Sequence, residues 1–292
     1  MTNKRWIIGC GDIGRRVVNL YKKQANKSLI NIYALVNSQA SKERCDALGI
    51  HSVALDLDDK NAVVNLGNQL QDSQLFYFAP PPQNGVEDTR LQNFLSSLSA
   101  QPKRIVLIST TGVYGDSKGE WIDESYPIKP QAERAQRRLS AEKALQAWAQ
   151  TYQRETIILR VAGIYATDRL PLARLKKGLP VVKQEEAGWT NRIHADDLAM
   201  VCKLAMESNR SDEVYNVTDG HPSSMTAYFN QVADYAQLPR PPQISMQQAE
   251  LALSAGMLSY LRESRRISNQ KMLDDLSVEL VYPSLKQGLS LS

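Results

Sequence analysis

The chain has 292 residues, of which 42% are hydrophobic and 23% are charged. This length suits one large α/β domain or a nucleotide-binding domain with a smaller lobe, and the composition is that of an ordinary globular protein. The net charge of +4 is small and evenly spread, so it predicts neither nucleic acid nor a membrane surface as a partner.

Short apolar runs alternate with amphipathic stretches through the first two thirds of the chain. The apolar runs are mostly rich in β-branched or aromatic residues, which predicts strands at 5–9, 31–36, 52–57, 74–79, 104–110 and 155–161. Helical periodicity predicts helices at 13–23, 41–48, 58–70, 88–98 and 131–152. Strands that alternate with helices favour parallel βαβ units, so we expect an α/β protein with a doubly wound parallel sheet, the Rossmann fold.

The alternation loosens after residue 165. A helix near 195–207 and a strand at 214–217 follow, and the tail from Pro222 is helical and polar with a stiff break at "LPRPPQ". We expect residues 1–165 to form a nucleotide-binding core to which 193–217 return. The remaining residues would form a smaller substrate lobe, at 166–192 and 218–292.

A glycine-rich turn joins the first strand to the first helix. In Gly9-x-Gly11-x-x-Gly14, the first glycine permits the tight turn, the second lets backbone approach a pyrophosphate, and the third allows close packing of helix on strand. The helix N-terminus would face the anion, with Asp12 and Ile13 beside it. This context predicts a dinucleotide site, although a structural turn in a ligand-free domain would also use these glycines.

The end of the second strand bears on which dinucleotide binds. An acidic residue there would bind the ribose hydroxyls of NAD. This chain has Asn37 and Ser38 instead, followed by Lys42 and Arg44. Without a carboxylate, nothing at this position repels a 2′-phosphate, and the two cations could attract it. Solvation of a helix face explains the cations equally well. The pattern favours NADP over NAD.

Several segments in chain order resemble the extended short-chain dehydrogenase/reductase superfamily, also called the NAD-dependent epimerase/dehydratase family. They are "IVLISTTGVYGD" (105–116), "LRVAGIY" (159–165), "NRIHADDLA" (191–199), "VYNVTDG" (214–220) and "YPSLKQGL" (282–289). The resemblance covers nearly the whole chain. It implies an NAD(P)-binding Rossmann domain, a smaller substrate lobe, and epimerase, dehydratase or reductase activity, often on nucleotide sugars.

The resemblance also implies further cofactor contacts. Asp56 and Leu57 in "ALDLDD" correspond to the family's turn beside the adenine, and Ala79 and Pro80 in "FAPPP" to its loop past the cofactor. Thr110 matches the Ser/Thr that binds the substrate oxygen in this family. Its neighbours Ser109 and Thr111 are alternatives for this role. A plainer interpretation is that these residues are a polar strand end that caps a turn.

The family's catalytic helix departs from its usual pattern here. Family members carry Y-x-x-x-K-x-x-A-E, in which the tyrosine is the acid/base and the lysine holds the nicotinamide ribose. Ala141 and Glu142 set the register, which places Arg134 at the tyrosine position and Arg138 at the lysine position. Arg138 can still donate hydrogen bonds to ribose. Arg134 can bind an anion but cannot shuttle a proton, because the guanidinium pKa lies above roughly 12.

Any proton transfer therefore needs a group other than Arg134. The alternatives in the sequence are Tyr114, Asp116, Glu133, Glu142, Lys143 and His194. A plainer interpretation is that Arg134, Arg138 and Glu142 form a surface ladder of ion pairs, because "ERAQRR" is typical of a solvated helix face. The retained Thr and lost YxxxK resemble the atypical short-chain dehydrogenases.

Four residues of the later segments have expected roles. His194 occupies a family position that is usually structural, and we expect Asp197 to cap or orient the following helix. Arg169 and Arg192 are expected substrate-lobe groups, since a cation there could meet an anionic substrate.

Two functions follow from these patterns. One is an NAD(P)-dependent oxidoreductase or epimerase/dehydratase-like enzyme acting on a sugar-derived or other small carbonyl substrate, which could be anionic. The other is a non-catalytic NADP-binding regulator or scaffold that responds to redox state. The scattered cysteines Cys10, Cys45 and Cys202 predict neither a disulfide framework nor a metal site. With no apolar run near roughly 18 residues and no signal peptide, we expect a cytoplasmic monomer or homodimer without a membrane span.

Overall fold

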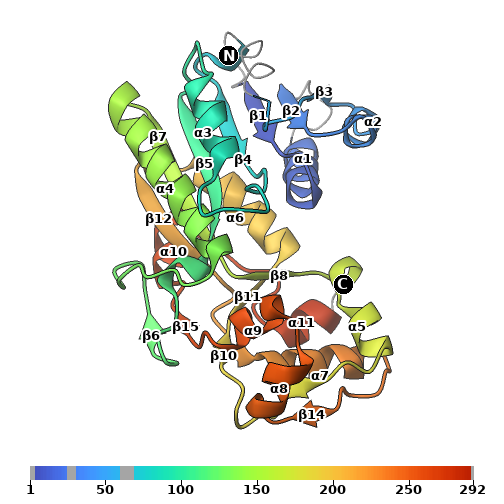
Figure 1. Cartoon of the computed structure of the whole chain (residues 1–292). Helices are drawn as coiled ribbons and strands as arrows, with labels where there is room; N and C mark the ends of the chain where they lie inside the picture. Colours follow the sequence, from blue (N-terminus) through green and yellow to red (C-terminus); the bar gives the residue numbers. More distant parts are fainter. Residues whose placement is uncertain (1–3, 25–30, 60–68, 291–292) are drawn as a thin grey trace.

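The computed structural model describes residues 4–24, 31–59 and 69–290. Its centre is a seven-stranded parallel sheet with the order β12-β7-β5-β4-β1-β2-β3 (Figure 1). The strands are β1 (Arg5–Ile8), β2 (Ile32–Val36), β3 (His51–Ala54), β4 (Gln74–Tyr77), β5 (Arg104–Thr110), β7 (Glu155–Val161) and β12 (Glu213–Val217). This confirms the doubly wound α/β fold that the alternating pattern predicted.

Helices cover both faces of the sheet, each over its own apolar core. On one face α1 (Asp12–Gln24) packs against α6 (Ala195–Glu207), and both contribute to a core that includes Val17, Val18 and Cys202. On the other face α3 (Thr89–Ser96) packs against α4 (Glu133–Tyr152) over a core that includes Phe94 and Leu145. The other helices beside the sheet are α2 (Gln39–Ala47) and α10 (Gln270–Leu276). The helix expected at 58–70 falls largely outside the described residues.

Short strands and helices form a region below the sheet in Figure 1, which we call the small region. Its paired strands are β8 (Gly163–Tyr165) with β11 (Arg192–His194), β9 (Val181–Val182) with β14 (Gln243–Ile244), and β10 (Trp189–Thr190) with β13 (Ser223–Ser224). Its helices are α5 (Leu172–Lys176), α7 (Met225–Tyr235), α8 (Met246–Ala252), α9 (Ala255–Leu261) and α11 (Leu285–Ser290). Beside it, β6 (Trp121–Ile122) pairs with β15 (Arg266–Ile267), and single 3-10 turns occur at η2 (Thr111–Tyr114) and η3 (Thr167–Arg169).

The small region has apolar cores separate from those of the sheet. One includes Leu175, Phe229 and Leu285, and another includes Val182 and Leu261. Strand β12 returns to the sheet beside β7, whereas β11 pairs with β8 of the small region. The domain boundaries predicted from the sequence stay a prediction.

The start of α6 corrects the capping part of the expectation for Asp197. His194 is the N-cap, because its Nδ1 accepts from the backbone N–H of Asp196 at 3.2 Å. Asp197 lies inside the first turn and does not cap the helix. Its two carboxylate oxygens accept from the N–H groups of Val281 and Tyr282, each at 2.9 Å, and so anchor the C-terminal segment to α6.

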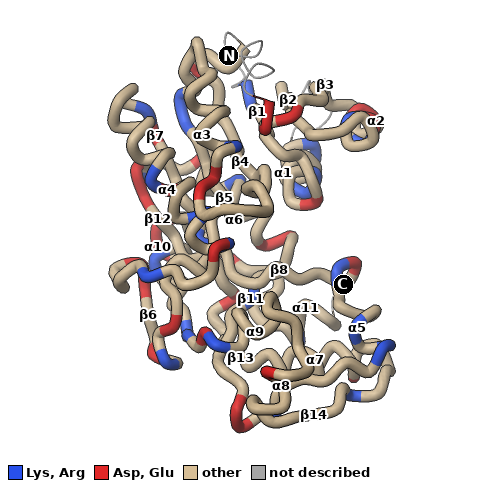
Figure 2. The backbone as a smooth tube through the Cα atoms, viewed as in Figure 1, with Lys and Arg blue, Asp and Glu red and all other residues tan. Residues whose placement is uncertain are grey.

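Charged residues of both signs are spread over the sheet and the small region alike (Figure 2). Within the described ranges, every helix is too short or too polar to cross a bilayer.

Candidate cofactor and substrate site

A cavity of about 300 Å³ lies at the carboxyl ends of β1, β2, β3 and β4, where open α/β sheets bind their ligands. We call it the cofactor cavity. Seven of the predicted cofactor residues line it: Gly9, Gly11, Asn37, Asp56, Leu57, Ala79 and Pro80. The polar or thiol-bearing lining residues that were not predicted as cofactor contacts include Cys10, Arg15, Ser41 and Arg90, of which all but Arg90 are close in sequence to predicted ones.

The glycine turn fits its predicted task. Gly9 has φ +85°, and a Cβ atom there would lie 2.5 Å from the backbone nitrogen of Ala79. Only glycine therefore lets the end of β1 pack against the loop after β4. A Cβ on Gly11 would meet only the carbonyl oxygen of Gly9, at 3.9 Å, so the face toward the cavity stays open for a ligand.

Four predicted cofactor residues do not line the cavity. Gly14 lies below the turn, where a Cβ would approach Ile7 at 3.0 Å, and Ile13 is buried in the core. Ser38 caps α2 by accepting from the N–H of Ser41 at 3.3 Å. Gly14 and Ile13 therefore support the glycine turn, and Ser38 supports α2, without lining the cavity.

Asp12, the fourth, belongs to an ion-pair cluster. It pairs with Arg16 at 3.0 Å and with Arg169 at 2.8 Å. Arg16 also pairs with Asp168 and Asp196, which ties α1 to η3 and α6. The expectation that Arg169 is a substrate group is corrected, because Arg169 does not line the substrate cavity and its guanidinium contacts Asp12 instead.

Arginines dominate the charge of the cofactor cavity. Arg90 forms an ion pair with Asp58 at 2.8 Å, whereas Arg44 donates to the neutral hydroxyl of Ser41 at 2.9 Å. Arg44 and Asn37 both line the cavity. Lys42 does not line the cavity and pairs with Asp46 at 2.5 Å.

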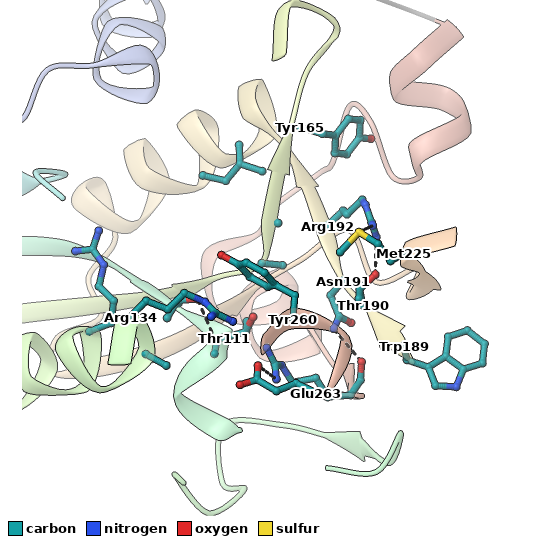
Figure 3. Close-up of a pocket in the computed structure, with 18 of the residues that line it drawn as sticks. Thr111, Arg134, Tyr165, Trp189, Thr190, Asn191, Arg192, Met225, Tyr260 and Glu263 are labelled. Carbon is teal, nitrogen blue, oxygen red and sulfur yellow. Dashed lines mark hydrogen bonds and ion pairs between the residues drawn. The ribbon is translucent and has the colours of Figure 1, made fainter. Parts of the chain in front are cut away.

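A second cavity, of about 450 Å³, lies between the carboxyl end of β5, the start of α4 and the small region (Figure 3). We call it the substrate cavity. It brings together all three predicted catalytic residues, Thr110, Arg134 and Arg138. Thr111 also lines it, whereas Ser109 is buried below and donates to Glu142 at 2.5 Å.

The arginines of α4 have different partners. The guanidinium of Arg134 stacks 3.7 Å from the ring centroid of Tyr260 and donates to Ser259 Oγ at 2.5 Å. Arg138 lies deeper, with Nη1 3.9 Å from a carboxylate oxygen of the buried Asp88. Burial lowers the pKa of Arg138 and raises that of Asp88, and the attraction between the two opposes both shifts.

The surface-ladder interpretation of these residues is wrong. Glu142 is 1% exposed and pairs with Arg160 of β7 at 2.8 Å, not with Arg134 or Arg138. Arg137, within "ERAQRR", is itself only 8% exposed. The physical reason is that α4 packs against α3 on one side and β5 and β7 beneath it, so little of this stretch is solvated.

The proton donors suggested by the sequence are not in the lining of the substrate cavity. Tyr114 is buried, donates to Asn216 at 2.8 Å and accepts from Arg160 at 3.0 Å. Asp116 accepts from the N–H groups of Lys118 and Ser264. Burial lowers the pKa of His194, which packs between two tyrosine rings.

Three tyrosines that sequence reasoning missed do line the substrate cavity. Tyr165 donates to the carbonyl of Ser284 at 3.1 Å, and the ring of Tyr228 lies 4.0 Å from the guanidinium of Arg192. Tyr260 is 47% exposed, and within the described residues its hydroxyl has no hydrogen-bond partner. Tyr165 ends the family-like segment "LRVAGIY" but had no predicted role, and no motif contains Tyr228 or Tyr260. The three come from β8, α7 and α9 and meet only in the fold.

The parallel sheet and its glycine turn place the protein among the dinucleotide-binding Rossmann folds. A profile of the NAD dependent epimerase/dehydratase family matches residues 7–218, and the chain belongs to this family. Its members bind NAD and are largely NAD-dependent enzymes. The family resemblance seen in the sequence is thereby confirmed.

Individual relatives extend the comparison. "Protein YeeZ" from Escherichia coli K12 is 25% identical over 190 residues, a match that spans 64% of this chain and 62% of that protein. A solved structure of a functionally unknown conserved protein from Silicibacter pomeroyi is 26% identical, with a TM-score of 0.81 over 99% of this chain and 97% of the other. UDP-glucose 4-epimerase from Thermotoga maritima, solved with UDP-glucose, shares the fold at 19% identity and a TM-score of 0.79, over 99% and 96% of the two chains.

Proposed function

We propose that the protein is an NADP-dependent oxidoreductase or epimerase/dehydratase-like enzyme that acts on a sugar-derived or other small carbonyl compound. One observation carries this proposal: Pro80 lines the cofactor cavity and Pro81 the substrate cavity, so the two cavities adjoin along one loop. The open backbone at Gly11, where a Cβ would meet only the carbonyl oxygen of Gly9, supports the close approach of a pyrophosphate. Nicotinamide, when bound, supplies hydride chemistry.

The choice of NADP rests on the charges around the adenosine end of the cofactor cavity. Arg15 and Arg44 line it, and Asn37 stands where an acid would repel a 2′-phosphate. Arg44 is held only by a neutral serine hydroxyl, which leaves its guanidinium fork available for phosphate oxygens.

The residues of the substrate cavity then have distinct tasks. We assign binding of the substrate oxygen to the hydroxyl of Thr110, and hydrogen bonding to ribose to the guanidinium of Arg138. The lining holds four arginines against one glutamate, which favours an anionic substrate.

We assign proton transfer to Tyr260. A phenol can donate and accept a proton, which the guanidinium of Arg134 cannot do at neutral pH. Figure 3 shows the Tyr260 ring extending into the cavity beside Arg134. The residue thus brings from α9 the side-chain type that α4 lacks at position 134.

Two experiments test the proposal. Calorimetry measures the binding of NADP and NAD, and a screen of sugar nucleotides, aldehydes and ketones follows turnover at the absorbance band of reduced nicotinamide. With an active substrate, Tyr260→Phe should lower kcat by about 10²–10⁴-fold. Tyr152→Phe is a matched control, because Tyr152 is also 47% exposed but lies at the far end of α4. Full activity of Tyr260→Phe would exclude Tyr260 as the acid/base.

A second candidate is a non-catalytic NADP-binding regulator, which the arginines at positions 134 and 138 favour because neither shuttles protons. It predicts that a partner protein binds with different affinity in the presence of oxidised and reduced cofactor. Tight NADP binding without turnover of any carbonyl compound in the screen would support this candidate over the enzyme.

A further inference from the structure

One buried arginine in the substrate cavity differs from the other buried arginines of the described chain. Arg104, Arg137 and Arg160 are each less than 9% exposed, and each has a carboxylate within 4.0 Å. Arg192 is 6% exposed, but no carboxylate of the described residues lies within that distance. A buried charge without an opposite charge is costly, so proteins usually provide one.

The contacts of the Arg192 guanidinium are neutral. Nη1 donates to Thr190 Oγ1 at 2.8 Å and more weakly to Ser223 Oγ at 3.4 Å, and Nη2 lies 3.7 Å from Met225 Sδ. The ring of Tyr228 covers one face, with its centroid 4.0 Å away. Burial lowers the pKa of Arg192 to about 10, so the group remains a cation at neutral pH.

Asp219 is the acid whose charge acts on Arg192 from a distance. It is 3% exposed, forms no ion pair with Arg192, and accepts instead from the N–H of His221 at 2.9 Å. Its carboxylate thus offsets only part of the cost of burying the guanidinium. A ligand that enters the cavity has access to the same cation, since Arg192 is part of the lining.

We infer that Arg192 is an oxyanion subsite, which binds a carboxylate or phosphate group of the substrate at the end remote from the reacting carbon. Figure 3 places Arg192 and Thr111 on opposite sides of Tyr260, so an acidic group at Arg192 leaves the rest of the molecule to extend toward Thr110. The planar guanidinium fork matches two oxygens of a carboxylate or phosphate. This inference rests on the proposed function and narrows its substrate class to acidic carbonyl compounds.

The test measures binding of simple anions by the full-length protein. Thermal unfolding and calorimetry are carried out with inorganic phosphate and with malonate, each against sodium chloride at equal ionic strength. The variants are Arg192→Gln, Arg192→Lys and the control Arg240→Gln. Arg240 suits the control because its side chain is 62% exposed, in the same region, and pairs with Asp234.

The native protein and Arg240→Gln should show the same rise in Tm with at least one of the two anions. Arg192→Gln should weaken that binding by about tenfold or more, and Arg192→Lys by less, because lysine keeps the charge but loses the fork. In chloride alone, Arg192→Gln should unfold at an equal or higher temperature, since it removes a buried cation without a carboxylate partner. A response to malonate alone would identify a carboxylate, and one to phosphate alone a phosphate.

Three results would overturn the inference: no response to either anion, an equal response in Arg192→Gln, or a lower Tm of Arg192→Gln in chloride. The last would make Arg192 a structural cation that holds Thr190 and Tyr228 together. Failure of the proposed function is separate, because it would appear as absent NADP binding while the Arg192-dependent anion response persists.

Discussion

The cofactor cavity and the substrate cavity are built in different ways. Most of the cofactor cavity comes from the ends of four neighbouring strands, and each predicted lining residue lies within a few positions of a strand end. The substrate cavity combines β5, α4, β11, α7 and α9, which are far apart in the chain. A site built from strand ends is visible in a sequence, whereas a site built across two packed regions depends on how those regions pack.

The substrate cavity should depend strongly on the buried pair beneath it. Glu142 accepts from Arg160 at 2.8 Å and from Ser109 at 2.5 Å, next to Thr110. Glu142→Gln would leave Arg160 as a buried cation without its counter-charge, so the free energy of unfolding should fall by about 3–5 kcal/mol in urea denaturation. Asp72→Asn, which breaks an exposed pair with Arg154, should cost less than about 1 kcal/mol. If both variants lost the same free energy of unfolding, the substrate cavity would not depend on the buried pair of Glu142 and Arg160.

The free energy of unfolding should depend on pH through Asp219, the buried acid whose charge acts on Arg192. Burial raises the pKa of this carboxyl group from 3.8 to about 6. Between about pH 4 and 6 the folded protein therefore holds a proton that the unfolded chain has released, and the free energy of unfolding falls as the pH rises. The full decrease is up to about 3 kcal/mol above pH 6. Asp219→Asn should remove it in urea titrations at pH 4.5 and 7.5.

Asp234→Asn is the control for that titration. A hydrogen bond from Arg240 lowers the pKa of the exposed Asp234, so its contribution to the pH dependence has the opposite sign. If Asp219→Asn kept the native slope, the proton uptake would belong to another group.

The cofactor cavity should be most sensitive at Gly9. An alanine there must adopt φ +85° and place its Cβ 2.5 Å from Ala79 N, so we expect about 1–3 kcal/mol of backbone strain together with loss of NADP binding. Gly49→Ala separates the two effects, because φ is +64° but nothing lies within 4 Å. Urea denaturation and calorimetry should show reduced stability in both variants and lost binding only in Gly9→Ala. Retained NADP binding in Gly9→Ala would mean that the turn tolerates a side chain.

These contrasts explain what could be predicted from the sequence. Periodicity predicted the sheet, and the glycine spacing predicted the turn, because both depend on residues close in the chain. Burial of Arg137 and Glu142 could not be predicted, since a helix pattern does not reveal which neighbours cover a charged face. Tyr260 was missed for a related reason: it reaches Arg134 only in the folded chain, where α9 lies beside the start of α4.

The smallest expected effect concerns the choice between the two dinucleotides. Arg44→Gln should weaken NADP binding by about tenfold and leave NAD binding unchanged, because only NADP carries the 2′-phosphate that this guanidinium would contact. Lys42→Gln should change neither affinity, since Lys42 already pairs with Asp46 outside the cavity lining. Calorimetry at two salt concentrations checks both variants, and the NADP difference should shrink at high salt. If Arg44→Gln lost affinity equally for NAD and NADP, Arg44 would contact a part that both cofactors share. If it lost affinity for neither, the NADP preference would rest on Asn37 and Arg15 alone.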